Sequence, residues 1–196
     1  MSEKIFQGLP YSRKSKTKGS YKTIPIINIK DIDNGQISIK GLDTMIVDSH
    51  RDIDRYMVRP GDVVITCRGT LLKSAVVPEA LNGYLITSNL IAIRLNGDFE
   101  SVLLSAFFQS PVGQKILLSN VRSSTMQIAL TVSDIEKIEV PLIPVEIQKR
   151  LAGLIAASDN YYKAAIESAN LRRDIAYSTA LKSFMQSSNQ LEVKGE

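Results

Sequence analysis

The chain contains 196 residues, of which 44% are hydrophobic and 22% are charged, and it carries a formal net charge of +4. This composition is typical of a soluble globular protein with room for one ordinary domain and a long additional element. No apolar run approaches the roughly 18–20 residues of a membrane-spanning helix, and the start of the chain lacks the apolar core of a signal peptide. A single cysteine, Cys67, excludes an internal disulfide bond, so we expect a cytoplasmic protein with no membrane partner.

Strands and tight turns are expected between residues 23 and 95. Residues 23–29 and 36–40 each predict a strand, and the turn signal Asp33-Asn34-Gly35-Gln36 between them favours a hairpin. Pro60-Gly61-Asp62 indicates a second tight turn. The segments that follow it predict three further strands, at residues 63–66, 73–77 and 90–95.

From residue 101 onward the apolar residues follow a helical period. Helices are predicted at residues 101–109 and 111–118, and Ser133 and Glu136 have the spacing of a capping box for a short third helix. Hairpins followed by late helices argue against a repeated βαβ unit. We therefore expect an α+β fold, with a mixed β-sheet domain over residues 1–143.

The longest predicted element is a helix over residues 144–187, followed by a polar tail at residues 188–196. Pro144 suits the first helical position, and Glu146 places negative charge at the positive end of the helix dipole. At 1.5 Å per residue the helix would be a rod of roughly 60 Å. Apolar residues recur along it at helical spacing: Ile147, Leu151, Leu154, Ile155, Tyr162, Ile166, Ile175 and Leu181.

An apolar stripe on so long a rod predicts a partner helix, because one small domain offers too little surface to cover it. The partner would come from a second copy of the chain or from another protein. A helix that folds back on its own domain remains the alternative.

Catalytic signatures are missing from the sequence. The sequence has one histidine, His50, and one cysteine. These are too few ligands for most zinc sites, and they argue against a catalytic Cys–His pair. The glycines do not form a Rossmann, kinase or Walker A loop, and the prolines are never adjacent, as an adenine methyltransferase motif would require. We therefore expect no metal, no cofactor and no catalytic site, and a binding module rather than an enzyme.

Three stretches of the chain carry motifs in a distinctive order. Residues 56–70 read YMVRPGDVVITCRGT, residues 88–94 read SNLIAIR, and residues 140–151 read VPLIPVEIQKRL. Together they resemble the specificity subunit of type I restriction–modification enzymes: a strand and loop with a Gly-Asp pair, a central strand, and the start of a conserved long helix. Glu146 and Gln148 stand where that family has an adjacent Glu-Gln pair.

The resemblance implies a target recognition domain followed by a conserved spacer helix. Full-length members of the family carry two of each, so this chain, with one of each, resembles half of such a subunit. The family reads a bipartite sequence in double-stranded DNA, has no activity of its own, and docks onto a methyltransferase subunit that brings S-adenosylmethionine.

Basic and polar side chains in three predicted loop regions are candidates for the DNA contacts that this resemblance implies. Lysine and arginine neutralise phosphates, whereas arginine, hydroxyl and amide groups also read base edges. An ordinary solvated loop or turn remains the alternative for each region. The candidates are Arg13, Lys14, Lys16, Lys18, Arg68, Thr70, Lys73, Arg122, Ser123, Ser124, Thr125 and Gln127.

Three functions compete on these observations. The leading one is a DNA specificity module that homodimerises through antiparallel long helices and reads an interrupted palindrome. The second is an assembly or scaffold protein, which dimerises by its helix and binds another protein instead of DNA. The third, a fused methyltransferase or nuclease, is disfavoured by the missing motifs.

Overall fold

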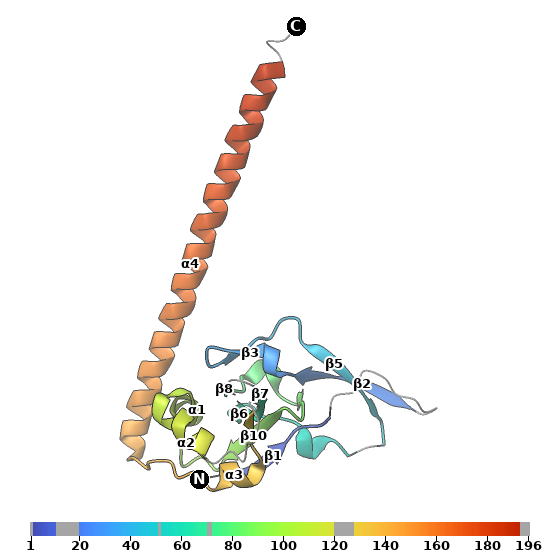
Figure 1. The fold of residues 1–196 in the computed structure, drawn as a ribbon, viewed down its shortest axis with the longest axis vertical. Coiled ribbons are helices and arrows are strands. Elements are labelled where there is room, and N and C mark those ends of the chain that lie inside the picture. Colours follow the sequence, from blue (N-terminus) through green and yellow to red (C-terminus); the bar gives the residue numbers. More distant parts are fainter. Residues whose placement is uncertain (1, 11–19, 51, 70–71, 120–127, 193–196) are drawn as a thin grey trace. The chain divides into compact units, whose positions relative to one another are not determined.

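The structure is a computed structural model that describes residues 2–10, 20–50, 52–69, 72–119 and 128–192. The side chains of Ile128 and of residues 186–192 lie outside this description. Contacts divide the chain into two units, Met1–Ala152 and Gly153–Glu196. The first unit contains the strands and the short helices, and the second contains most of one long helix (Figure 1). The predicted α+β fold with a long helix is confirmed.

The first unit is organised around a four-stranded antiparallel sheet with the strand order β1-β10-β6-β8. The strands are β1 (Ser2–Gln7), β6 (Val63–Thr66), β8 (Ser74–Val76) and β10 (Leu90–Leu95). Every residue of β6 is buried, and in β10 only Leu95 is partly exposed. Burial on both faces explains why the two central strands are continuous apolar runs, which is the pattern that predicted them.

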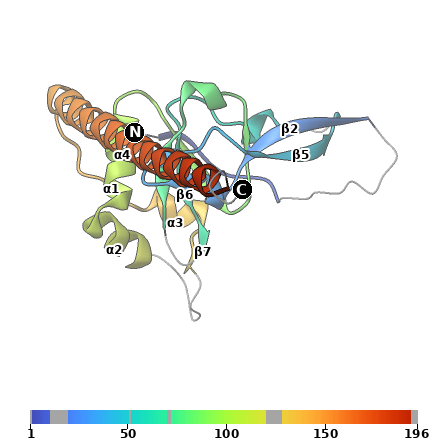
Figure 2. The ribbon, with the colours of Figure 1, turned by 90° about the horizontal axis from the view of Figure 1, so that it is seen from above.

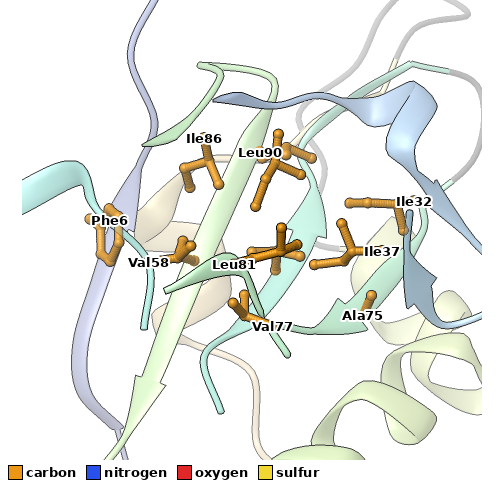
Figure 3. Close-up of a cluster of buried hydrophobic side chains, with 12 residues drawn as sticks. Phe6, Ile32, Ile37, Val58, Ala75, Val77, Leu81, Ile86 and Leu90 are labelled. Atoms are coloured by element: carbon orange, nitrogen blue, oxygen red, sulfur yellow. The ribbon is translucent and has the colours of Figure 1, made fainter. Parts of the chain in front are cut away.

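The two faces of this sheet bury separate hydrophobic clusters. Successive side chains of a strand point to opposite faces. Val64 and Ala92 therefore join Leu90 in one cluster, which also contains Phe6, Val58 and Leu81. Figure 3 shows Leu90 and Leu81 in this cluster. Val63, Ile65, Ile91 and Ile93 alternate with them along the same strands and join the other cluster, against Leu104, Phe108 and Leu117 of the helices.

The predicted hairpin between residues 23–29 and 36–40 is wrong. Strand β2 (Tyr21–Ile27) pairs instead with β5 (Asp43–Asp48) antiparallel and with β9 (Leu85–Ile86) parallel. The predicted turn is present, but Asn34 and Gly35, with φ of 45° and 76°, close a hairpin between the short strands β3 (Ile32–Asp33) and β4 (Gln36–Ile37). Two adjacent residues with positive φ make a turn so tight that its partners must be immediate neighbours in sequence.

Two helices cover the sheet face that carries Ile65 and Ile91. They are α1 (Ser101–Gln109) and α2 (Pro111–Ser119), as predicted. Between them the Ser110 hydroxyl accepts a hydrogen bond from the Gly113 backbone N–H at 3.0 Å, as an N-cap does. The remaining pair of short strands, β7 (Arg68–Gly69) and β11 (Ile128–Ala129), is antiparallel.

The short helix α3 (Val132–Glu136) is capped by a different pair of residues than predicted. Thr131 is the N-cap, and its hydroxyl accepts from the Asp134 N–H at 3.2 Å while the Asp134 carboxylate accepts from the Thr131 N–H at 3.0 Å. The expected Ser133–Glu136 box is wrong because the helix starts two residues earlier, where aspartate in the third position serves as well as the glutamate of the usual pattern.

The predicted long helix is confirmed as α4 (Val145–Glu192), 48 residues that begin directly after Pro144. It runs five residues past the predicted end at residue 187, so the first part of the predicted polar tail is helical, and residues 193–196 lie outside the described residues. Its first turns belong to the first unit, and the helix continues from Gly153 as the second unit. In the part of the chain that the structure describes, no helix is long and apolar enough to cross a membrane.

A buried ion pair joins Asp62, directly before β6, to Arg94 of β10. The Arg94 guanidinium donates to both carboxylate oxygens of Asp62, at 2.9 and 2.7 Å, and Asp62 and Arg94 are only 2% and 8% exposed. The same carboxylate accepts from the Arg59 N–H at 2.8 Å. The hydrogen bond to Asp62 raises the pKa of Arg94 above its usual value, against the opposing effect of burial. The Gly-Asp motif of the sequence therefore has an architectural role here.

Replacing Gly113 with alanine should destabilise the first unit. A Cβ at this position would lie 2.7 Å from the Phe107 carbonyl carbon, at the junction of α1 and α2, so one helix must shift. We expect Gly113→Ala to lower the free energy of unfolding by about 1–3 kcal/mol, measured by urea denaturation. Gly153→Ala is the matched control, because its Cβ would meet open space within α4. Equal midpoints for the two variants would contradict this packing.

Replacing Asp62 with asparagine should be more damaging than its size suggests, because it leaves the Arg94 charge buried without a counter-charge. We expect a loss of about 3–5 kcal/mol in the free energy of unfolding, and recovery of much of it in the double variant Asp62→Leu/Arg94→Met. Asp33→Asn is the control, since the carboxylate of Asp33 is 75% exposed and lies 3.6 Å from Lys73. A loss no larger than that of the control would show that the buried pair does not hold the sheet.

Candidate nucleic-acid interface

The pairing of β7 with β11 brings two of the candidate loop regions to one place. Arg68 pairs with Ala129 and Gly69 pairs with Ile128. Thr70 follows Gly69 directly, and the loop at residues 120–127 ends where β11 begins. Segments that are far apart in sequence therefore have their described ends side by side in this short ladder.

Arg68 is the one arginine of this ladder, and its side chain is exposed. The residue before it is held by two backbone hydrogen bonds: buried Cys67 donates its N–H to the Asn89 carbonyl at 2.9 Å, and its own carbonyl accepts from the Leu130 N–H at 2.9 Å. Gly69 has a φ of 123°, a backbone conformation that favours glycine. Because glycine has no side chain, nothing projects from the backbone next to Arg68 at this position. An exposed guanidinium on a rigidly held backbone is suited to contact DNA.

The remaining candidates of these two regions lie outside the described residues. They are Thr70, Arg122, Ser123, Ser124, Thr125 and Gln127. Arg13, Lys14, Lys16 and Lys18 of the first basic loop also lie outside the described residues.

The first basic loop borders a different part of the first unit. The residues that follow it begin β2, where Tyr21 pairs with Asp48, and the Ser49 N–H donates to the Ser20 carbonyl at 3.0 Å. Figure 2 shows the β2–β5 ladder and β7 apart from each other. The candidate regions therefore border the described structure at two separate places: the basic loop at the β2–β5 ladder, and the other two regions at the β7–β11 ladder.

Lys73 is already engaged within the first unit. Its ammonium donates to the Ile32 carbonyl at 2.9 Å and lies 3.6 Å from the Asp33 carboxylate, so it holds the β3–β4 hairpin. Its backbone N–H donates to the Thr66 hydroxyl at 2.8 Å. Because the side chain is still 36% exposed, contact with a phosphate remains a prediction, in competition with these internal bonds.

The apolar residues predicted to form the stripe of α4 face solvent. Their exposed fractions are 41% for Ile147, 40% for Leu151, 67% for Leu154, 51% for Tyr162, 48% for Ile166, 55% for Ile175 and 60% for Leu181, and Ile155 is half-buried. Tyr161, Leu171, Tyr177 and Phe184 are exposed as well and were not part of the prediction. Large apolar side chains in water at this density mark an interaction surface.

The described residues offer little to metal or cofactor chemistry. Within them, no three His, Cys, Asp or Glu side chains lie close enough to hold a metal ion. Burial raises the pKa of the Cys67 thiol, and its sulfur donates to the Ser88 carbonyl at 3.4 Å. A buried neutral thiol is a poor nucleophile, so Cys67 serves packing.

Comparison with known proteins agrees with this architecture. No curated protein matches the chain in sequence. The solved structures similar to it include one described by the complex assembly and conformational transition of the type I R-M system, with 24% identity and a TM-score of 0.58 over 87% of this chain and 46% of the other. The HsdS subunit from Thermoanaerobacter tengcongensis is similar at 24% identity and a TM-score of 0.56, over 83% of this chain and 43% of the other. The chain thus spans less than half the length of either relative.

A family model matches most of the chain. It is the type I restriction modification DNA specificity domain, and the match covers residues 5–173, which include the sheet, the short helices and much of α4. Members of this family are non-catalytic, and the enzymatic activity lies in partner subunits. The chain belongs to the family of type I restriction modification DNA specificity domains.

Proposed function

We propose that this protein is a half-length specificity subunit that directs a type I restriction–modification complex to one half of a bipartite DNA target. The family match over residues 5–173 carries the proposal. It agrees with the presence of one strand-rich unit and one long helix.

Sequence reading is assigned to the region around the β7–β11 ladder. Arg68 is exposed there on a fixed backbone, and the two regions that border the ladder contain further arginine, hydroxyl and amide groups. These are groups that read base edges in the major groove. The basic loop at residues 12–18 would contribute phosphate contacts, which position a protein on DNA without reading sequence.

Pairing of α4 with a second copy would supply the other half-site. A helix of 48 residues is about 72 Å long, or about two turns of DNA at 34–36 Å per turn. Antiparallel pairing about a twofold axis would cover the exposed apolar residues of both helices and place one reading domain at each end. The target would then be an interrupted palindrome. A methyltransferase subunit is the expected further partner, and with it a cytoplasmic location.

A scaffold that binds another protein instead of DNA is the competing function. The exposed stripe of α4 would fit it equally, but it gives no role to an exposed arginine at the β7–β11 ladder. Duplex DNA binding that weakens with increasing salt separates the two, because phosphate contacts release counterions and protein contacts of α4 do not.

Arg68→Ala should weaken binding to the target mainly at one base position. Loss of a bidentate contact to a base costs about 1–3 kcal/mol in discrimination, whereas loss of a phosphate contact weakens all sequences alike. Binding is measured by fluorescence anisotropy on duplexes that carry each base substitution in turn. Lys163→Ala, an exposed position of α4 with the same loss of charge, is the control. If Arg68→Ala binds every duplex as the wild type does, Arg68 is not a DNA contact.

Leu154→Glu should convert the dimer to a monomer at micromolar concentration, as measured by analytical ultracentrifugation. Leu154 is 67% exposed within the predicted stripe, and a buried carboxylate there would lack a partner. Ala156→Glu is the matched control, because two residues along a helix lead to its opposite side. A wild-type protein that sediments as a monomer would refute homodimerisation but leave reading of a half-site possible.

A further inference from the structure

The turn at residues 87–90, between β9 and β10, is bonded to the segments that lead into both groups of candidate DNA contacts. On one side the Ser88 N–H donates to the Leu9 carbonyl at 2.7 Å, and Leu9 lies just before the first basic loop. On the other side the Asn89 carbonyl accepts from the Cys67 N–H at 2.9 Å, directly before β7. All of these residues belong to the first unit.

Asn89 lies across the sheet from the residue that precedes Arg68. β10 and β6 pair antiparallel with Leu90 opposite Thr66, so one further step along the same register sets Asn89 opposite Cys67. Adjacent strands are about 4.8 Å apart. The Asn89 side chain therefore starts from a backbone that neighbours the one carrying the exposed arginine.

The backbone of this turn is held without help from the Asn89 side chain. The Leu90 N–H donates to the Thr87 carbonyl at 2.9 Å, and the Ser88 carbonyl accepts from the Gln7 side-chain amide at 2.6 Å. The Asn89 side chain is partly exposed, and no hydrogen bond joins its amide to any of the described residues. Its donor and acceptor can therefore bind a ligand without loss to the turn.

The usual structural reasons for an asparagine in a turn do not apply to Asn89. Asparagine tolerates a positive φ, as at Asn34, but no other non-glycine residue among those described has one. Asparagine also bonds to the backbone two residues on, as Asn96 does when its side-chain oxygen accepts from the Asp98 N–H at 3.3 Å. Asn89 makes no such bond, so the fold of the turn does not explain its side chain.

We propose that Asn89 is a specificity-determining residue that reads an adenine of the half-site, near the base assigned to Arg68. The proposal rests on the proposed function, because it requires the region around the β7–β11 ladder to face DNA. In the major groove adenine presents an N6 amino donor and an N7 acceptor, and the oxygen and nitrogen of an asparagine amide match this pair. A backbone fixed on both sides of the turn holds the amide ready for such a bidentate contact.

Selection from a random duplex library tests the proposal, because the protein itself then picks out its target. The full-length wild type should select one half-site sequence. Asn89→Ala should select the same sequence except at one position, where the preference for adenine falls by roughly 5- to 150-fold. Asn89→Asp keeps the shape of the side chain but replaces the donor by a second acceptor. It should shift that position to cytosine, whose N4 amino group donates to a carboxylate.

Asn82→Ala is the matched control. Asn82 is likewise a turn asparagine whose side chain has no hydrogen bond to the described residues, but the next residue, Gly83, donates its N–H to the Val58 carbonyl rather than to a candidate region. This variant should select the wild-type half-site at every position. All variants are checked for an unchanged circular dichroism spectrum and an unchanged midpoint of urea unfolding.

The outcomes separate this proposal from the proposed function. A wild-type protein that selects no sequence contradicts the proposed function and, with it, the role of Asn89. If the wild type selects a half-site and the folded Asn89→Ala variant keeps every base preference, or weakens binding to all sequences alike, the role of Asn89 alone is overturned. Loss of one adenine preference, at a position other than the one that Arg68→Ala alters, supports it.

Discussion

The buried ion pair between Asp62 and Arg94 is the interaction on which the rest of the first unit depends. From each of its two residues the chain leads to a further region of that unit. The pair joins β6 and β10, whose side chains fill the clusters on both faces of the sheet. From the pair, β6 runs to Thr66, and Cys67 then connects it to Arg68 of β7, the exposed arginine of the candidate interface. β10 runs from Arg94 into the turn to which the Gln148 side chain is hydrogen-bonded. One buried interaction thus lies at the start of the strand that leads to the candidate interface and near the end of the strand that leads to the turn bonded to Gln148.

Long periodic segments were predictable from sequence, whereas pairing between distant strands was not. The period of α4 and the apolar runs of β6 and β10 are local signals, and they identified these elements. β1 and β5 were missed because each is half-exposed, with charged or polar residues such as Lys4 and Asp48 among its apolar ones. The partner of β1 is β10, which is remote in sequence. The partner of β5 is β2, which the sequence analysis had paired with residues 36–40 across the turn at Asn34-Gly35.

The candidate site shows the same division. Arg68 was named as a candidate because an arginine beside glycine at a strand end is a visible pattern, and its role in DNA binding stays a prediction. Gln148 was identified only as a motif residue, since a glutamine in the first turns of a helix is usually solvated, and its burial depends on acceptors and a donor from the turn some fifty residues earlier. The architectural role of Asp62 was hidden in the same way, because a Gly-Asp turn gives no sign of the arginine 32 residues away.

The exposed apolar residues of α4 also bear on how the protein survives in the cell before assembly. A helix that presents Leu154, Tyr161, Leu171 and Phe184 to water will associate with any comparable surface, including that of misfolded chains. Copies whose α4 stays uncovered would therefore be exposed to chaperones and proteases. If the mate is a second copy of the chain, as proposed, the protected fraction should rise with the concentration of the chain itself.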